Sequence, residues 1–354
     1  NGGGKYIHNK SNSTVPGTNR YFANATNGGN GNGTFEIQDY GATTFPTGIT
    51  WGNVIINCSS TSSDVSHGGA FANVDGNFTM QQHGTHRFTL VNNETTAHSI
   101  DGDLTVSGGS LNFKSGSGTF TVNLGGNLSI STGTLDATSG ITDLTFTGTN
   151  PDFTQNSGTF TNSFINFIVN SGSTLTLKSS LAIPSARKLT VNGSVSVDAT
   201  KSLSISSGGT IELSSNATVS GSGGFTLSAG GTIIIGSSDG ITTAGNSSGS
   251  IQSTTRTYNV GGIYEYKGSS SQVTGNGLPD NLTGTFRINN SAGVTLSLNR
   301  RVNGTLSFTN GKLFTTNSSI LSLGVSASTP GYSSLKYVDG PLRRYFNSGN
   351  LSKT

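Results

Sequence analysis

The chain has 354 residues, with 19 Lys or Arg against 16 Asp or Glu, so its net charge is +3. Only 10% of the residues are charged, 31% are apolar and 52 are glycines. The single cysteine excludes an intramolecular disulfide framework, and the thin spread of basic residues lacks the basic stripe typical of nucleic-acid binding. No segment approaches the ~20 apolar residues that span a bilayer as a helix. We therefore expect no nucleic-acid partner and no membrane insertion.

Short runs of Val, Ile, Thr, Phe and Tyr alternate with small polar residues and are separated by Gly and Asn. This period of two predicts half-buried β-strands joined by turns, and helical periodicity is absent. The chain is predicted to be all-β with no significant helix.

Residues 1–50 fit the strand pattern least well because they contain long Gly and Asn runs. They predict an irregular N-terminal region or the first coils of the fold that follows, with one strand at 34–37. Glu36 and Asp39 lie on either side of the end of that strand, near Tyr40, and we expect both carboxylates to be solvated.

The next segment begins at Trp51, which we expect to anchor the core, and runs through alternating apolar residues to Cys58. Cys58 is predicted to be a small buried side chain. His83 and His86 follow at a spacing that could bind a metal ion. Because no third ligand is evident, a pair of loop histidines is the favoured interpretation and a metal site the weaker hypothesis. No cofactor is predicted.

A phrase of the form Gly-x-Leu-x-apolar, followed by a Gly-centred turn and a second Leu, recurs along the chain. Leu104 and Leu128 are 24 residues apart, and so are Leu111 and Leu135. A fixed period of this size indicates a stacked solenoid. We predict a parallel β-helix with coils of about 24 residues. The repeat residues are Gly102, Leu104, Leu111, Gly126, Leu128, Leu135, Gly193, Val195, Gly304, Leu306 and Leu313.

Within one coil, Leu104 and Val106 are predicted to face inward and Thr105 outward, because successive strand residues alternate in direction. Stacking in register would build apolar ladders along the solenoid. Gly at the corners is expected to supply positive φ angles. The continuous β-helix is predicted over 51–345.

Three segments share an opening motif in which an aromatic residue precedes an apolar strand that ends in Asn. They indicate three degenerate modules, which start near 51, 164 and 284. Residues 346–354 are predicted to begin a linker to a further domain.

Parallel β-helices also include polysaccharide lyases and hydrolases, whose acid/base chemistry needs carboxylates gathered on one face. Asp101 and Asp103 alternate along one strand and form the best pair, but Asp101 suits a turn cap and Asp103 an outward-facing surface position, so no catalysis is predicted. Asp136, Asp198 and Glu212 stand alone in their strands, with no basic partner evident nearby in sequence. Stacking could bring a basic partner from another coil.

Tyr264 and Tyr266 alternate along one predicted strand and so share one of its faces. Facing outward, they would form a platform on which sugar rings stack; facing inward, they would fill the core. The core position is the favoured prediction.

The run from Tyr264 to Gly268, the segment 274–279, the opening motif at 282–290 and the closing phrase 337–344 resemble the β-helical repeat regions of a known class of proteins. These are large secreted, adhesin-like surface proteins of Bacteroidetes, typically exported by the type IX pathway. The resemblance is good over 258–345 and fair over 100–215. It implies an extracellular or cell-surface location and a structural or adhesive role, without naming a ligand. We predict that the chain is not an enzyme.

Several partners follow from this interpretation. Low charge and small polar side chains suit packing against glycans, other cell-surface components or copies of the chain, and exposed coil ends permit self-association. Two alternatives stay open: a carbohydrate-active β-helix enzyme, either a polysaccharide lyase or a hydrolase, and a secreted cargo bound to its secretion machinery.

Overall fold

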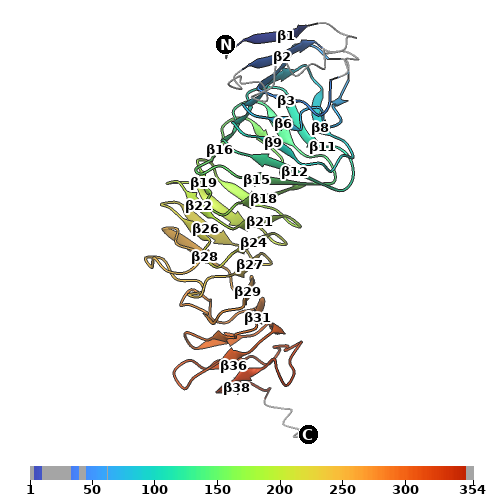
Figure 1. The fold of residues 1–354 in the computed structure, drawn as a ribbon. Helices are drawn as coiled ribbons and strands as arrows, with labels where there is room; N and C mark the ends of the chain where they lie inside the picture. Colours follow the sequence, from blue (N-terminus) through green and yellow to red (C-terminus); the bar gives the residue numbers. More distant parts are fainter. Residues whose placement is uncertain (1–3, 10–32, 40–44, 62, 348–354) are drawn as a thin grey trace. The chain divides into compact units, whose positions relative to one another are not determined.

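The structure is a computed structural model that describes residues 4–9, 33–39, 45–61 and 63–347. Over these residues it contains no helix, and its parallel strands form a β-solenoid of about 13 turns with coils of about 23 residues (Figure 1). The predicted parallel β-helix is confirmed. The chain divides into two compact units, which we call unit 1 (residues 1–179) and unit 2 (residues 180–354).

The described residues of unit 1 form three stacks of strands, in which each strand pairs in parallel with the equivalent strand of the next coil. The first stack is β1 (Lys5–Asn9), β2 (Thr34–Asp39), β4 (Asn53–Cys58), β7 (Phe78–His83), β10 (Leu104–Val106), β13 (Leu128–Ile130), β16 (Asp152–Gln155) and β19 (Thr174–Leu177). The second is β3 (Thr50–Trp51), β6 (Asn73–Val74), β9 (His98–Ile100), β12 (Thr119–Leu124), β15 (Ile141–Phe146) and β18 (Ile165–Val169). The third is β5 (Val65–Ser66), β8 (Arg87–Val91), β11 (Ser110–Lys114), β14 (Thr134–Asp136) and β17 (Thr159–Phe160).

Unit 2 is built in the same way. Its longest stack is β21 (Lys188–Val191), β24 (Thr210–Leu213), β27 (Thr232–Ile235), β29 (Ile263–Gly268), β31 (Thr285–Asn290) and β34 (Thr305–Asn310). Further stacks are β22 (Ser194–Val197) with β25 (Thr218–Ser220), and β20 (Leu181–Ile183), β23 (Ser202–Ile205), β26 (Gly224–Leu227) and β28 (Thr255–Tyr258). The last coils add β30 (Gln272–Val273), β32 (Val294–Thr295), β35 (Leu313–Phe314) and β37 (Val338–Asp339), and β33 (Arg300–Val302), β36 (Leu321–Leu323) and β38 (Leu342–Arg344).

The repeat phrase sets the register of the stacks. Leu104 pairs with Leu128, and Leu111 pairs with Leu135, as predicted. All four leucines are fully buried, whereas Thr105 is partly exposed on the outer face. The remaining apolar repeat residues are also buried in ladders: Val195 pairs with Val219, Leu306 with Phe286 and Leu313 with Val294.

The corner glycines act differently from the prediction. Gly102, Gly126 and Gly304 do not adopt positive φ angles. A Cβ on Gly102 would lie 2.7 Å from the carbonyl oxygen of Gly76, and one on Gly126 would lie 2.5 Å from the same atom of Gly102. Glycine is required at these two positions because the preceding coil approaches too closely for a side chain. The Gly-centred turns do follow the prediction, for example at Gly109 with φ 63°.

Aromatic rings fill the core of unit 1. Trp51 is fully buried, stacks on Phe35 with ring centroids 4.8 Å apart, and donates its indole N–H to the carbonyl oxygen of Ala70 at 2.7 Å. Cys58 is fully buried as well, and burial raises the pKa of its thiol to about 12. Both residues occupy the core positions predicted for them.

Aliphatic ladders dominate the core of unit 2, with two tyrosines among them. Tyr264 and Tyr266 are fully buried, so the inward position is confirmed. Tyr266 donates its hydroxyl hydrogen to the carbonyl oxygen of Thr274 at 2.6 Å. Each buried hydroxyl thus keeps a partner, since Tyr264 donates to the carbonyl oxygen of Asn259 at 2.7 Å.

The expectation that Glu36 is solvated is wrong. Its side chain is 3% exposed and accepts hydrogen bonds from Gln38 (2.8 Å) and Asn57 (2.7 Å), and it forms an ion pair with Lys5. Burial raises the pKa of Glu36, but these partners together lower it. The carboxylate is buried because β1, β2 and β4 stack directly on one another.

Part of the predicted organisation stays a prediction. Strands β1 and β2 pair in parallel within the first 50 residues, but residues 1–3, 10–32 and 40–44 lie outside the described ranges. The predicted linker falls mostly on residues 348–354, which are also outside them. The hypothesis of three modules rests on sequence similarity alone and also stays a prediction.

Candidate functional site

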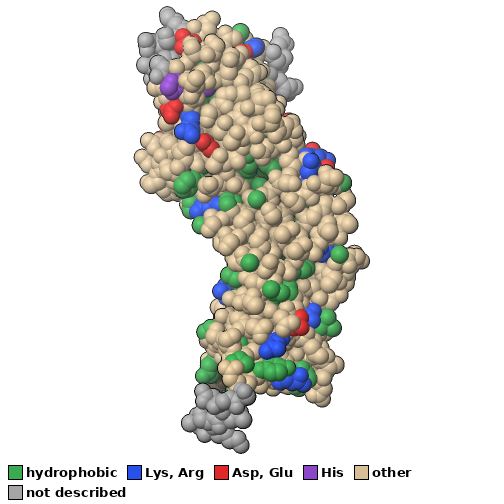
Figure 2. Space-filling view, turned by 180° about the vertical axis from the view of Figure 1, so that it is seen from behind, with side chains coloured by type: hydrophobic (Ala, Val, Ile, Leu, Met, Phe, Trp, Pro, Cys, Tyr) green, Lys and Arg blue, Asp and Glu red, His purple; other side chains and the backbone are tan. Residues whose placement is uncertain are grey.

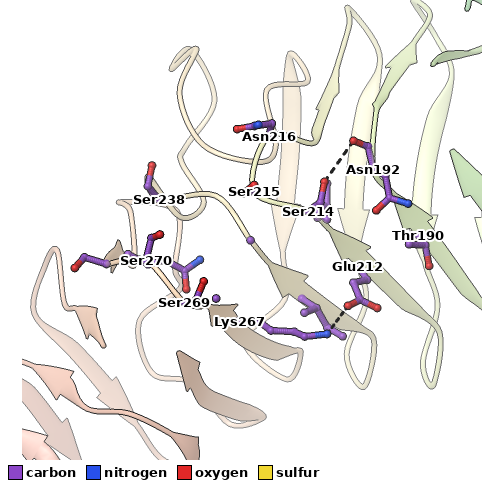
Figure 3. Close-up of a pocket in the computed structure, with 16 residues that line it drawn as sticks. Thr190, Asn192, Glu212, Ser214, Ser215, Asn216, Ser238, Lys267, Ser269 and Ser270 are labelled. Carbon is purple, nitrogen blue, oxygen red and sulfur yellow. Dashed lines mark hydrogen bonds and ion pairs between the residues drawn. The ribbon is translucent and has the colours of Figure 1, made fainter. Parts of the chain in front are cut away.

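A polar pocket of about 480 Å³ lies at the carboxyl ends of β21, β24, β27 and β29 in unit 2 (Figure 3). Gln272 forms part of one wall of the pocket. Its buried side-chain amide is held in place by hydrogen bonds that it donates to the carbonyl oxygens of Ile235 (2.9 Å) and Ser237 (3.0 Å). Hydroxyl, amide and charged groups dominate the rest of the lining: Thr190, Asn192, Glu212, Ser214, Ser215, Asn216, Ser238, Lys267, Ser269, Ser270 and Ser271.

Glu212 in this pocket is bound by two lysines from other coils. Lys188 Nζ lies 3.0 Å from one carboxylate oxygen, and Lys267 Nζ lies 2.6 Å from the other. Burial raises the pKa of Glu212, but the hydrogen bonds from both lysines outweigh it, so the pKa is lowered. The same contact raises the pKa of Lys267. Glu212 is therefore held as a carboxylate.

A second carboxylate extends this charged row along the outer face of the sheet. Glu265 stands two strands from Glu212 in the same column, with Ile234 between them. Its side chain is buried and accepts from Arg287 at 2.9 Å and from Asn289 at 2.6 Å. Both glutamates are thus bound by basic or amide partners from neighbouring coils.

The pocket chemistry suits binding better than proton transfer. A general acid needs a raised pKa at neutral pH, whereas the pKa of Glu212 is lowered. The volume falls within the range of small-molecule sites. Hydroxyls, amides and one lysine ammonium offer donors and acceptors to a ligand rich in hydroxyl groups.

Among the residues that the structure describes, Asp101 and Asp103 do not form a cluster with a third acid. Asp103 belongs to a ladder of Asn and Asp side chains at the corner between β9 and β10. Its Oδ1 accepts the backbone N–H of Asn127 at 2.7 Å, while its own N–H binds Asn77 Oδ1 at 2.8 Å. Asn53 begins and Asp152 ends this ladder. Asp101 is exposed beside it.

His83 and His86 take separate positions. His83 is fully buried, with its Nδ1 3.0 Å from the carbonyl oxygen of His86, and burial lowers its pKa. His86 Nδ1 instead lies 3.3 Å from a carboxylate oxygen of Asp64. Among the residues that the structure describes, no group of three His, Cys, Asp or Glu is placed to hold a metal ion.

Stacking did bring basic partners to two of the acids that seemed isolated in the sequence. Besides Glu212, Asp136 meets Arg87 at 3.2 Å across β11. Burial nevertheless raises the pKa of Asp136, the reverse of the shift at Glu212. Sequence analysis missed Glu265 and Lys267 as site residues, although both lie in the run that carries the family resemblance.

Comparison with protein-family models, with curated proteins and with solved structures finds no match to this chain. Within the described ranges, no helix is long and apolar enough to cross a membrane.

Proposed function

We propose that the chain is a non-catalytic structural and adhesive repeat scaffold within a large extracellular protein at the bacterial cell surface. One observation carries this proposal: the polar groups best placed for chemistry hold one coil to the next. Asp103 caps a backbone N–H of the following coil, and Glu212 binds lysines from two other coils. The location and the type IX export route rest on the resemblance of residues 258–345.

Adhesion would use the pocket beside Glu212, with glycans as the ligand class. Lys267 and the surrounding serines present hydrogen-bond donors and acceptors at the open surface of the sheet. Because its lining contains no aromatic side chain, recognition would depend on hydrogen bonds rather than on ring stacking.

The test measures binding and cleavage on the same polysaccharide panel. We expect retention on immobilised glycans without any decrease in polymer length or any new reducing or unsaturated ends. Lys267→Met should weaken retention, while Lys201→Met, which removes a lysine outside the pocket, should not. Cleavage that Glu212→Gln abolishes would refute the scaffold proposal.

A carbohydrate-active enzyme is the second candidate, and the observation that favours it lies in unit 1. Asp136 has a raised pKa, as a general acid requires, and Arg87 links it to Asp64 by donating its backbone N–H at 2.8 Å. Asp136 is only 5% exposed, however, so a substrate has little access to it. Loss of a measured cleavage activity in Asp136→Asn would support this candidate.

A further inference from the structure

The two units carry opposite net charges. Unit 1 contains 6 Lys or Arg and 10 Asp or Glu, a net charge of −4. Unit 2 contains 13 Lys or Arg and 6 Asp or Glu, a net charge of +7. Opposite charge on separate parts of one chain favours contact between copies of that chain, because potentials of opposite sign steer encounter.

The basic charge of unit 2 is concentrated in its last coils. Between residues 300 and 347 the basic residues are Arg300, Arg301, Lys312, Lys336, Arg343 and Arg344, and the single acid is Asp339. Lys312 pairs with Asp339 at 3.2 Å. In the described part of the chain, no ion pair is found for the four arginines. Figure 2 shows Lys and Arg side chains beside hydrophobic ones over these coils.

Two of these arginines form one outward column. In the sheet β33-β36-β38, Arg301 pairs with Ser322, and Ser322 pairs with Arg343. Two strand spacings put the two arginine positions ~9–10 Å apart. The Arg301 guanidinium lies 4.4 Å from the centre of the Tyr345 ring, which restricts its orientation. We call this pair the arginine column.

The arginine column has no carboxylate partner among the residues that the structure describes. Arg343 is exposed and Arg301 is partly exposed, and neither guanidinium forms an ion pair within the described residues. The nearby carboxylate of Asp280 accepts a hydrogen bond from the backbone N–H of Arg301 at 2.7 Å rather than from its guanidinium. A partner that brings carboxylates would give both guanidinium groups the bidentate acceptors that they prefer.

Unit 1 displays carboxylates at the same spacing. In the ladder at its corner, Asp103 and Asp152 are separated by one Asn127, so they are also two strands and ~9–10 Å apart. Both side chains are partly exposed. Asp103 uses Oδ1 within the ladder, and among the described residues its second oxygen has no hydrogen bond. We call this pair the aspartate column.

We propose that the arginine column of unit 2 binds the aspartate column of unit 1 in a second copy of this chain. The equal spacings let two ion pairs form at once, and the opposite net charges of the units add long-range attraction. A reciprocal contact closes a dimer, whereas a one-way contact links copies into a row. This proposal goes beyond the scaffold function and is independent of any glycan ligand.

Sedimentation velocity of the full 354-residue chain tests the proposal. At about 10 mM salt the mean mass should increase with protein concentration, and in about 1 M salt it should fall to that of the monomer, because screening shortens the Debye length from ~30 to ~3 Å. A contact within one chain would not depend on concentration.

Two variants remove the charges from opposite sides. Arg343→Glu alters an exposed side chain, and Asp103→Asn with Asp152→Asn keeps the ladder acceptors, since Asn occupies the other ladder positions. Each should weaken association about tenfold or more without changing the melting temperature. A mixture of the two variants should associate again, because each retains one intact column.

Several results would overturn the proposal. The wild-type chain could stay monomeric at low salt, or the Asp-to-Asn variant could associate as the wild type does. Lys201→Glu makes the same charge change elsewhere in unit 2, and an equal loss there would trace the effect to net charge alone. Binding of an acidic polysaccharide by a monomeric chain, lost in Arg343→Glu, would assign the arginine column to another polyanion.

Discussion

Units 1 and 2 have the same arrangement of parallel strands but differ in the side chains of their cores and in the charges on their outer faces. Unit 1 holds all five histidines and the only tryptophan, and its core stacks aromatic rings such as Trp51, Phe35 and Phe71. Unit 2 relies on Leu, Ile and Val ladders and has a row of ion pairs on its outer face. The parallel ladder therefore tolerates very different side chains, provided that each coil buries its inward positions.

The largest expected effect comes from removing the anchor of the aromatic core. Trp51→Ala should lower the free energy of unfolding by about 4 kcal/mol, whereas Ile233→Ala in the unit 2 ladder should lower it by about 3 kcal/mol. The tryptophan substitution leaves a larger cavity and also removes the hydrogen bond to Ala70. Urea denaturation with hydrogen exchange in the adjoining coils measures both. A larger loss for Ile233→Ala would contradict this ranking of the two cores.

Acid should weaken unit 1 before unit 2. Burial lowers the pKa of His67 to about 3 and that of His98 to about 4, both from 6.5. Their stabilisation is complete above pH 6.5 and is lost as the pH falls towards those values, by about 2 kcal/mol each at pH 5. Glu212 in unit 2 has a pKa lowered from 4.5, so its contribution is lost only at more acidic pH.

Hydrogen exchange at pH 7 and pH 5 distinguishes the two units. Exchange should accelerate in the coils around His67 and His98 and change little around Glu212. Asp136 has the opposite effect on the stability of unit 1, because burial raises its pKa and protonation at lower pH therefore favours the folded state. The variant Asp136→Asn removes this effect and serves as a control. His98→Leu should remove part of the acid sensitivity. Equal acceleration in both units would show that the histidines are not its source.

A smaller effect is expected in the charged row of unit 2. Glu212→Gln leaves Lys188 and Lys267 without their shared carboxylate and should cost about 1 kcal/mol, because the lysines are half exposed and well solvated. Added salt should reduce this cost by screening the repulsion between the lysines. Urea denaturation at two salt concentrations measures it, and a loss that grows with salt would argue against the repulsion.

The smallest effect separates charge from hydrogen bonding in the corner ladder. Asp103→Asn should change the free energy of unfolding by less than about 0.5 kcal/mol, since Asn can still accept the N–H of Asn127. Asp103→Ala should cost about 1 kcal/mol, because it leaves that N–H without its partner. Thermal unfolding of the three chains provides the measurement. Equal losses in both variants would mean that the charge of Asp103 matters to the fold.

The sequence allowed prediction of the features that depend on near neighbours. The 24-residue spacing of Leu104 and Leu128 predicted their pairing. Strand alternation placed Tyr264 and Tyr266 on one face, and their position in the run that carries the family resemblance favoured the inward side, where both are buried. The prediction of a positive φ angle at Gly102 was wrong, because glycine is needed there to avoid the backbone of the previous coil and not to adopt a special φ angle.

The candidate site could not be predicted because it joins residues at unequal separations. Lys188 is 24 residues from Glu212, but Lys267 is 55 residues away, since the coil between β27 and β29 carries a long excursion. A fixed period therefore predicts one of the two contacts and misses the other.

By itself, the sequence determined the all-β class, the parallel solenoid and the inward ladders, because side-chain alternation and the repeat act over one coil or between regular coils. Only the tertiary structure decided which charges meet. The two lysines on Glu212, and the alignment of Arg301 with Arg343 across β36, depend on how many residues each intervening coil contains. Ion pairs form through space at a few ångströms, and loop length changes which residues come within that distance without altering the local pattern.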